Sequence, residues 1–118
     1  MALVEQKDFA SPDDVMNFEL GRIEILKMAD GGVGRFILQP GWQWSKHEKP
    51  IVGTDLCEIP HYLYVVQGRL RVRMADGQEM DVGPGSVARL PAGHDAWVVG
   101  DEALVGVDWH GVSVRSKV

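Results

Sequence analysis

A histidine begins an almost wholly apolar stretch of the chain. His61 opens "HYLYVVQ", residues 61–67, whose Tyr, Leu and Val side chains favour β-strands. Three roles fit a histidine in that place: a metal ligand, a polar group in a metal-free pocket, or a hydrogen-bonded core residue. Imidazole suits Zn, Fe, Cu and Ni, and cysteine and carboxylate side chains are also competent ligands. The chain offers three further histidines and one cysteine, Cys57, for such a site.

Short strands have to position these side chains. Turn signals with Gly and Pro recur at short intervals, among them "QPG" at 39–41 and "PAGHD" at 91–95. Between them lie short runs rich in Val, Ile, Leu, Tyr and Trp, including "WQWSKHE" at 42–48, with no long helical period. The clearest hairpin is 69–82, with Asp76–Gly77 at its tip. This pattern predicts an all-β sandwich or barrel.

Three pieces of sequence, in order, resemble the two motifs of the cupin superfamily. They are "PGWQWSKH", "HYLYVVQGRLRV" and "GPGSVARLPAGHDAWVV", which lie within residues 33–110. With "PAGHDAWVVGDE", the chain is similar to small single-domain bacterial cupins. The resemblance implies a jelly-roll barrel of two sheets with a central pocket and, in many members, a divalent metal. We therefore expect an N-terminal arm at 1–18, a cupin barrel at 19–112 and a C-terminal tail at 113–118.

The first cupin motif commonly supplies two histidines as His-x-His and then a Glu seven residues before a Gly. By this resemblance His47 matches the first histidine, Lys49 stands at the second, and His61 takes the Glu position. The loop "PIVGTDLCEIP" then separates Lys49 from His61. In a gap-free alignment, Asp55 and Cys57 would occupy the His-x-His positions instead.

The second motif usually supplies a histidine three residues after the Gly of Pro-x-Gly. That position is Ala96 in this chain, and the nearest histidine is His94, directly after Gly93. His94 is either a ligand or a loop residue that only caps or orients a neighbour. Cys57 is either a ligand or a loop or core thiol. The metal ligands that the resemblance implies are therefore His47 and His61, completed by His94, Cys57 or Asp55.

The strand period of two places His47 and Lys49 on one face, and it places His61 on a face with apolar side chains. If both faces point inward, His47 and His61 approach each other, and a third ligand leaves one position open for substrate. Lys49 is unfavourable beside a dication, which favours a metal-free pocket for an anionic molecule instead. Asp108 is either a partner that fixes a histidine tautomer or an exposed strand residue.

Two classes of function follow from the resemblance. The first is a metal-dependent cupin enzyme, of dioxygenase, isomerase or lyase type, that acts on a small organic molecule. A divalent transition metal (Zn, Fe, Mn, Cu or Ni) would be the cofactor, with Lys49 and Asp108 as candidate catalytic groups. The second is a metal-free cupin that binds or senses a small molecule without catalysis.

Four large aromatic side chains predict an association surface. Trp42 and Trp44 share a face opposite to His47, and Tyr62 and Tyr64 share a face opposite to His61. If the histidines point inward, these aromatics point outward and form a patch that is unusual on a monomer. We expect a second subunit to cover the patch in a homodimer. Burial under the N-terminal arm is the alternative.

Composition narrows the partners and the location. The net charge of −5 argues against nucleic acid, because phosphate binding needs a basic surface. The single cysteine precludes an intrachain disulfide, which fits a reducing compartment. The first residues lack the apolar core of a signal peptide, and no apolar run is long enough to span a membrane. The sequence therefore predicts a cytoplasmic protein whose partner is a small molecule.

Overall fold

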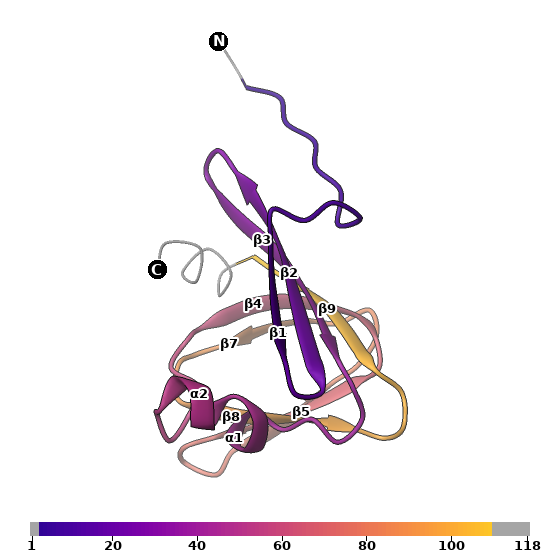
Figure 1. Cartoon of the computed structure of the whole chain (residues 1–118). Coiled ribbons are helices and arrows are strands. Elements are labelled where there is room, and N and C mark those ends of the chain that lie inside the picture. The colour runs from indigo at the N-terminus through magenta and orange to yellow at the C-terminus, as the bar shows by residue number, and fades with distance from the viewer. Residues whose placement is uncertain (1–2, 110–118) are drawn as a thin grey trace.

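The computed structural model describes residues 3–109, which form two antiparallel sheets and two short helices (Figure 1). The larger sheet has six strands in the order β1-β2-β3-β9-β4-β7, and the smaller has three in the order β6-β5-β8. In chain order, the strands and helices are β1 (Asp14–Phe18), β2 (Gly21–Met28), β3 (Gly31–Leu38), α1 (Trp44–His47), α2 (Lys49–Val52), β4 (His61–Gln67), β5 (Arg69–Met74), β6 (Glu79–Val82), β7 (Val87–Leu90), β8 (His94–Val99) and β9 (Leu104–Asp108). This double-sheet architecture confirms the predicted all-β sandwich.

The alternation of side chains explains how the two sheets enclose a core. In β4 the side chains of His61, Leu63 and Val65 are buried, whereas Tyr62 and Tyr64 are exposed. The apolar side chains of β5 turn inward in the same way, and its arginines lie outside or half outside. Burial of one face of each sheet fixes this register, because a slip by one residue would turn every apolar side chain to solvent.

The hairpin predicted at 69–82 is present. β5 and β6 pair antiparallel, with Leu70 opposite Val82, and Gly77 in the connecting turn has a φ of 92°. Glycine accepts this left-handed conformation without the steric cost that a Cβ atom brings. The turn chemistry of Asp76–Gly77 therefore identified the hairpin correctly.

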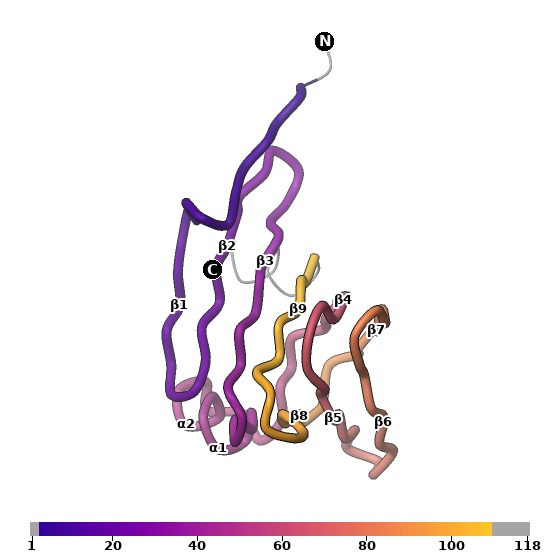
Figure 2. Tube along the Cα trace, turned by 90° about the vertical axis from the view of Figure 1, so that its right-hand side faces the viewer, coloured from indigo at the N-terminus to yellow at the C-terminus, as the bar shows by residue number. Residues whose placement is uncertain are grey.

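The N-terminal part of the chain lies along one end of the larger sheet. β1, which falls inside the predicted arm 1–18, pairs with β2 along its whole length. Residues before β1 lead away from the barrel beside the far end of the β2–β3 hairpin (Figure 2). Leu3 and Val4 in this segment are highly exposed. The predicted tail at 113–118 lies outside the described residues.

The strand predicted at 42–48 is wrong: the segment forms α1 instead, and α2 follows directly at Lys49–Val52. Asp95 of β8 accepts hydrogen bonds from the Ser45 N–H at 3.1 Å and from Gln43 Nε2 at 2.9 Å, which anchors the start of α1. Pro50 fits the first turn of α2, and Gly53 ends it with a φ of 89°. The "KPIVG" pattern of an early Pro and a terminal Gly was the sequence signal for this helix.

The helical turn reverses the expected direction of two aromatic side chains. Trp42 and Trp44, predicted to face outward, are 4% and 3% exposed and belong to the core. A period of two does not hold in this segment, so side chains at alternate positions do not share a strand face. Only the tyrosine half of the predicted aromatic patch is exposed.

No helix within residues 3–109 has both the length and the apolar character needed to cross a membrane.

Candidate metal centre

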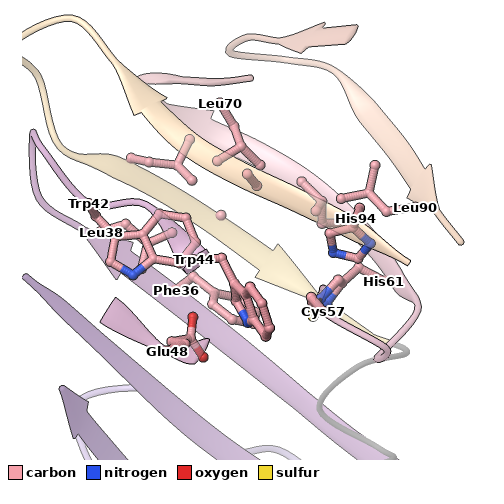
Figure 3. Close-up of a pocket in the computed structure, with 14 residues that line it drawn as sticks. Phe36, Leu38, Trp42, Trp44, Glu48, Cys57, His61, Leu70, Leu90 and His94 are labelled. Atoms are coloured by element: carbon pink, nitrogen blue, oxygen red, sulfur yellow. The ribbon is translucent and has the colours of Figure 1, made fainter. Parts of the chain in front are cut away.

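A pocket lies between the two sheets, with an empty volume of about 540 Å³ that includes its part open to solvent (Figure 3). Strands of both sheets and the α1 region contribute its walls. Most of the lining is apolar, and its polar side chains are Glu48, Cys57, His61 and His94. The apolar lining residues are Phe36, Leu38, Trp42, Trp44, Leu63, Leu70, Leu90, Ala96, Leu104 and Gly106.

Cys57, His61 and His94 gather at one end of this pocket, as Figure 3 shows. Their ligand atoms all lie within 4.8 Å of one another, and all three residues are buried. The Cys57 Sγ lies 3.7 Å from His61 Nε2, and the rings of His61 and His94 are 5.3 Å apart between centroids. Three such side chains converging from separate segments can hold a metal ion.

Backbone pairing brings the three residues together. His61 begins β4 and His94 begins β8, so both stand where their strands enter the barrel. Cys57 lies in the loop before β4 and forms an isolated antiparallel bridge with His94. In this bridge the Cys57 N–H donates to the His94 carbonyl at 2.8 Å, and the His94 N–H donates to the Cys57 carbonyl at 3.2 Å. The loop is therefore fixed to the smaller sheet at the position of the thiol.

A second layer of contacts orients both imidazoles. His61 Nδ1 lies 2.6 Å from Asp108 Oδ2, and Asp108 itself is fully buried on β9. His94 Nδ1 lies 2.7 Å from the Pro91 carbonyl oxygen, which can only accept a hydrogen bond. With the proton of each ring on Nδ1, Nε2 remains as the ligand atom, an arrangement typical of metal-binding histidines. Of the two alternatives for Asp108, the structure has the partner that orients a histidine.

The electrostatics of the group favour a thiolate. Burial raises the pKa of the Cys57 thiol, but hydrogen bonds from His61 and His94 lower it by more, so that the pKa is about 6. Burial lowers the pKa of His61, but the hydrogen bond to Asp108 and then that to Cys57 raise it to about 9. A cysteine that is deprotonated near neutral pH is the form that binds metals and acts as a nucleophile.

Several residues singled out from the sequence lie elsewhere. His47, on α1, does not join the group: its Nδ1 accepts a hydrogen bond from the Gln43 N–H at 3.0 Å. Lys49 Nζ pairs with Asp55 Oδ1 at 3.2 Å, and the Asp55 side chain is 97% exposed. Neither Lys49 nor His47 lines the pocket. Because α1 and α2 replace the expected strand, the proposed shared face of His47 and Lys49 does not exist.

Sequence reasoning missed the other end of the pocket. Trp42, Trp44 and Glu48 line it there, and the Glu48 residue is 6% exposed. Reading the segment as a helix would have suggested this cluster, because residues four apart, such as Trp44 and Glu48, lie on the same helix face.

Two sheets around a pocket with inward-facing histidines define a cupin. The family model of EutQ-like cupin domains matches residues 39–108, and the chain belongs to this family. No curated protein sequence matches the chain significantly.

Solved structures share the fold. A protein of unknown function from Rhizobium leguminosarum superposes with a TM-score of 0.62 at 18% identity, covering 92% of this chain and 98% of its own. The polyketide cyclase RemF from Streptomyces resistomycificus has a TM-score of 0.58 at 16% identity, covering 91% and 80%. Oxalate decarboxylase from Bacillus subtilis, described with Mn(II) centres, has a TM-score of 0.58 at 19% identity, covering 86% and 28%. At these identities the likeness concerns the fold alone.

Proposed function

We propose that this cupin is a metal-dependent enzyme, of dioxygenase, isomerase or lyase type, that acts on a small organic molecule in its central pocket. The observation that carries the proposal is the buried group of Cys57, His61 and His94 at one end of that pocket. Three protein ligands leave a coordination position open, which is the arrangement of catalytic rather than structural metal sites. Similar folds in a polyketide cyclase and in a decarboxylase described with Mn(II) centres support the proposal.

The donor set fits a borderline or soft divalent metal. One thiolate and two imidazoles suit Zn, Fe, Cu or Ni better than Mn, which prefers carboxylate and water ligands. When bound, the metal would supply a Lewis acid or an oxygen-activating centre. His61 would be held by Asp108 and His94 by the Pro91 carbonyl, so neither ring needs to reorient on binding.

Side chains of the protein would exclude water and would hold the His61 ring in position. The apolar walls would exclude water from the reacting part of the substrate. Asp108 would accept the Nδ1 proton of His61 in a hydrogen bond and would act as a positioning residue, since it is fully buried behind the ring. Lys49 is not proposed as a catalytic group, because it does not line the pocket.

One specific geometry favours a second candidate, a metal-free thiol enzyme. Cys57 Sγ, His61 Nε2 and Asp108 Oδ2 form a chain of a nucleophile, a base and an orienting carboxylate, with separations of 3.7 Å and 2.6 Å. This order is the one found in cysteine-dependent acyl transfer. The same three residues cannot serve both roles at once, because a metal would occupy the sulfur and Nε2.

Elemental analysis of the native protein separates the candidates. The protein is purified without chelator and without a nickel column, together with His61→Ala and the matched control His47→Ala. About one equivalent of Zn, Fe, Cu or Ni in the native protein and in His47→Ala, lost in His61→Ala, is the expected result. No metal and no uptake of supplied metals would overturn the proposal. Alkylation of Cys57 would then distinguish the thiol enzyme from a cupin that only binds a small molecule.

A further inference from the structure

The end of the pocket away from the metal-binding group is lined by different polar and aromatic side chains. Figure 3 shows Glu48 with Trp42 and Trp44 on one side, and Cys57, His61 and His94 on the other. The rest of the lining consists of leucines, Phe36, Ala96 and Gly106. A molecule that reaches from one end to the other must therefore pass through an apolar space that solvates polar groups poorly.

The charges at the Trp42–Glu48 end of the pocket select against anions. No lysine or arginine lines the pocket within residues 3–109, and Glu48 contributes a buried carboxyl group. At the Trp42–Glu48 end a carboxylate ligand would lose its hydration without gaining a cationic partner, because His61 and any bound metal lie at the opposite end, and it would face the carboxyl group of Glu48. The anionic ligand considered from the sequence relied on His47 and Lys49, which the structure places outside the pocket.

Trp42 adds a donor at the same end. Its Nε1 is buried and has no hydrogen-bond partner among the described residues. A buried donor without an acceptor destabilises the protein, so a ligand oxygen that accepts this hydrogen bond would be favoured. The backbone holds the residue in place, because the Val98 N–H donates to the Trp42 carbonyl at 3.0 Å.

We propose that the pocket binds a neutral, largely apolar molecule that carries a hydroxyl group, and that this hydroxyl group sits at the Trp42–Glu48 end. The hydroxyl oxygen accepts from Trp42 Nε1, and the hydroxyl proton is donated to Glu48. Trp42 and Glu48 are then the specificity-determining residues of the pocket. The inference rests on the proposed function only in using the same pocket, since neither residue belongs to the metal-binding group.

Naphthol and naphthoate form a matched pair of probes, because they share a ring and differ in charge. Isothermal titration calorimetry of the native protein is expected to show binding of naphthol at least roughly tenfold tighter than binding of naphthoate. Glu48→Gln is expected to narrow this ratio by strengthening naphthoate binding, and Trp42→Phe to weaken naphthol binding several-fold. Glu102→Gln and Trp109→Phe alter exposed side chains that do not line the pocket and serve as controls.

Naphthoate binding equal to or tighter than naphthol binding would overturn the proposal. So would an unchanged ratio in Glu48→Gln together with unchanged naphthol affinity in Trp42→Phe, provided that circular dichroism shows both variants folded. The titrations are repeated after chelator treatment, with metal content measured in parallel. Selective naphthol binding by a native protein that contains no metal as purified would support this inference and contradict the metal-dependent function. Full metal content in the native protein without naphthol selectivity would support the metal-dependent function and contradict this inference.

Discussion

His61 Nδ1 and Asp108 Oδ2 lie 2.6 Å apart in the core, on the neighbouring strands β4 and β9. The second carboxylate oxygen of Asp108 accepts the Tyr62 N–H at 3.2 Å, so both oxygens have partners. Asp108 is therefore fixed by the sheet and in turn fixes the ring that faces Cys57. This pair connects the strand register of the larger sheet to the geometry of the candidate metal site.

Asp108→Asn should weaken metal binding by roughly 10- to 100-fold, as is usual when the partner of a ligating histidine is changed. The amide can no longer accept the Nδ1 proton with a charged oxygen, so His61 Nε2 becomes a poorer ligand. Competition against a chromophoric chelator measures the change. Asp81→Asn, on the exposed side of β6, is the control and should leave affinity unchanged. Equal affinities in all three proteins would show that Asp108 does not position the ligand.

His94→Ala and His47→Ala should differ in their effect on the metal. His94 lies in the group with Cys57 and His61, so its loss should leave two ligands and greatly reduce binding. His47 contacts Gln43 on α1 instead, and its loss should not change the metal content. Atomic absorption of both purified variants gives the answer. Metal loss in His47→Ala alone would favour the ligand set first expected from the cupin motif.

The sequence could name the candidate ligands but could not choose among them. His61, His94 and Cys57 were all recognisable from residue type and motif position. Their meeting depends on the bridge between Cys57 and His94, a long-range pairing that local pattern does not encode. His47 was a candidate because it matches the first histidine of the cupin motif, and a strand at 42–48 would have turned it inward. The hydrogen bonds to Asp95 that anchor α1 instead are also long-range.

The thiol of Cys57 should titrate far below its ordinary pKa of 9.0 in the metal-free protein, with a midpoint near pH 6. Above this pH the thiolate predominates, and below it the neutral thiol forms. The ultraviolet absorbance of the thiolate follows the transition, and Cys57→Ala gives the baseline. In His61→Ala the midpoint should rise, because burial then acts with one fewer hydrogen bond to oppose it. A midpoint near the ordinary value in the unsubstituted protein would contradict the hydrogen bonds of the Cys57 thiol with His61 and His94.

Metal affinity should increase with pH up to about 9. His61, whose pKa is raised to about 9, carries a proton at neutral pH in the metal-free protein and must release it before Nε2 can bind. Titration calorimetry in buffers of different ionisation enthalpy counts the protons released. Affinity that is flat between neutral pH and pH 9 would mean that His61 is already neutral or is not a ligand.

Gly68→Ala should destabilise the fold more than Gly77→Ala does. Both glycines have positive φ, of 80° and 92°, which costs a residue with a Cβ roughly 1–2 kcal/mol. A Cβ at Gly68 would also lie 2.6 Å from the Ala103 carbonyl oxygen, whereas at Gly77 nothing lies within 4 Å. Urea unfolding should therefore show a loss of about 1 kcal/mol for Gly77→Ala and clearly more for Gly68→Ala. Equal losses would show that the backbone around Ala103 yields easily.

The strand pattern of the barrel was largely readable, whereas the helical segment was not. β4 follows a period of two from His61 to Val65, where its register shifts, β5 alternates in the same way, and the hairpin at Asp76–Gly77 follows its turn chemistry. In the helical segment, Trp42 and Trp44 carry strand propensity, but packing between the sheets and capping by Asp95 outweigh it. Local preference therefore predicted the strands, and tertiary contacts determined α1.

The outer face of β4 and β7 predicts a homodimer. Tyr62, Tyr64, Val66 and Val87 are 50%, 38%, 52% and 60% exposed, and Tyr64 lies directly opposite Val87. Within residues 3–109 no segment covers these side chains, and we expect a second subunit to bury them. β7 is also an edge strand of the larger sheet.

Light scattering coupled to size exclusion should give the mass of a dimer at micromolar concentration, and the double variant Tyr62→Ser, Tyr64→Ser should be monomeric. Met80→Ser, an exposed position on the smaller sheet, should remain dimeric. A monomer of the unsubstituted protein would refute the dimer, and a dimer in the double variant would place the interface elsewhere.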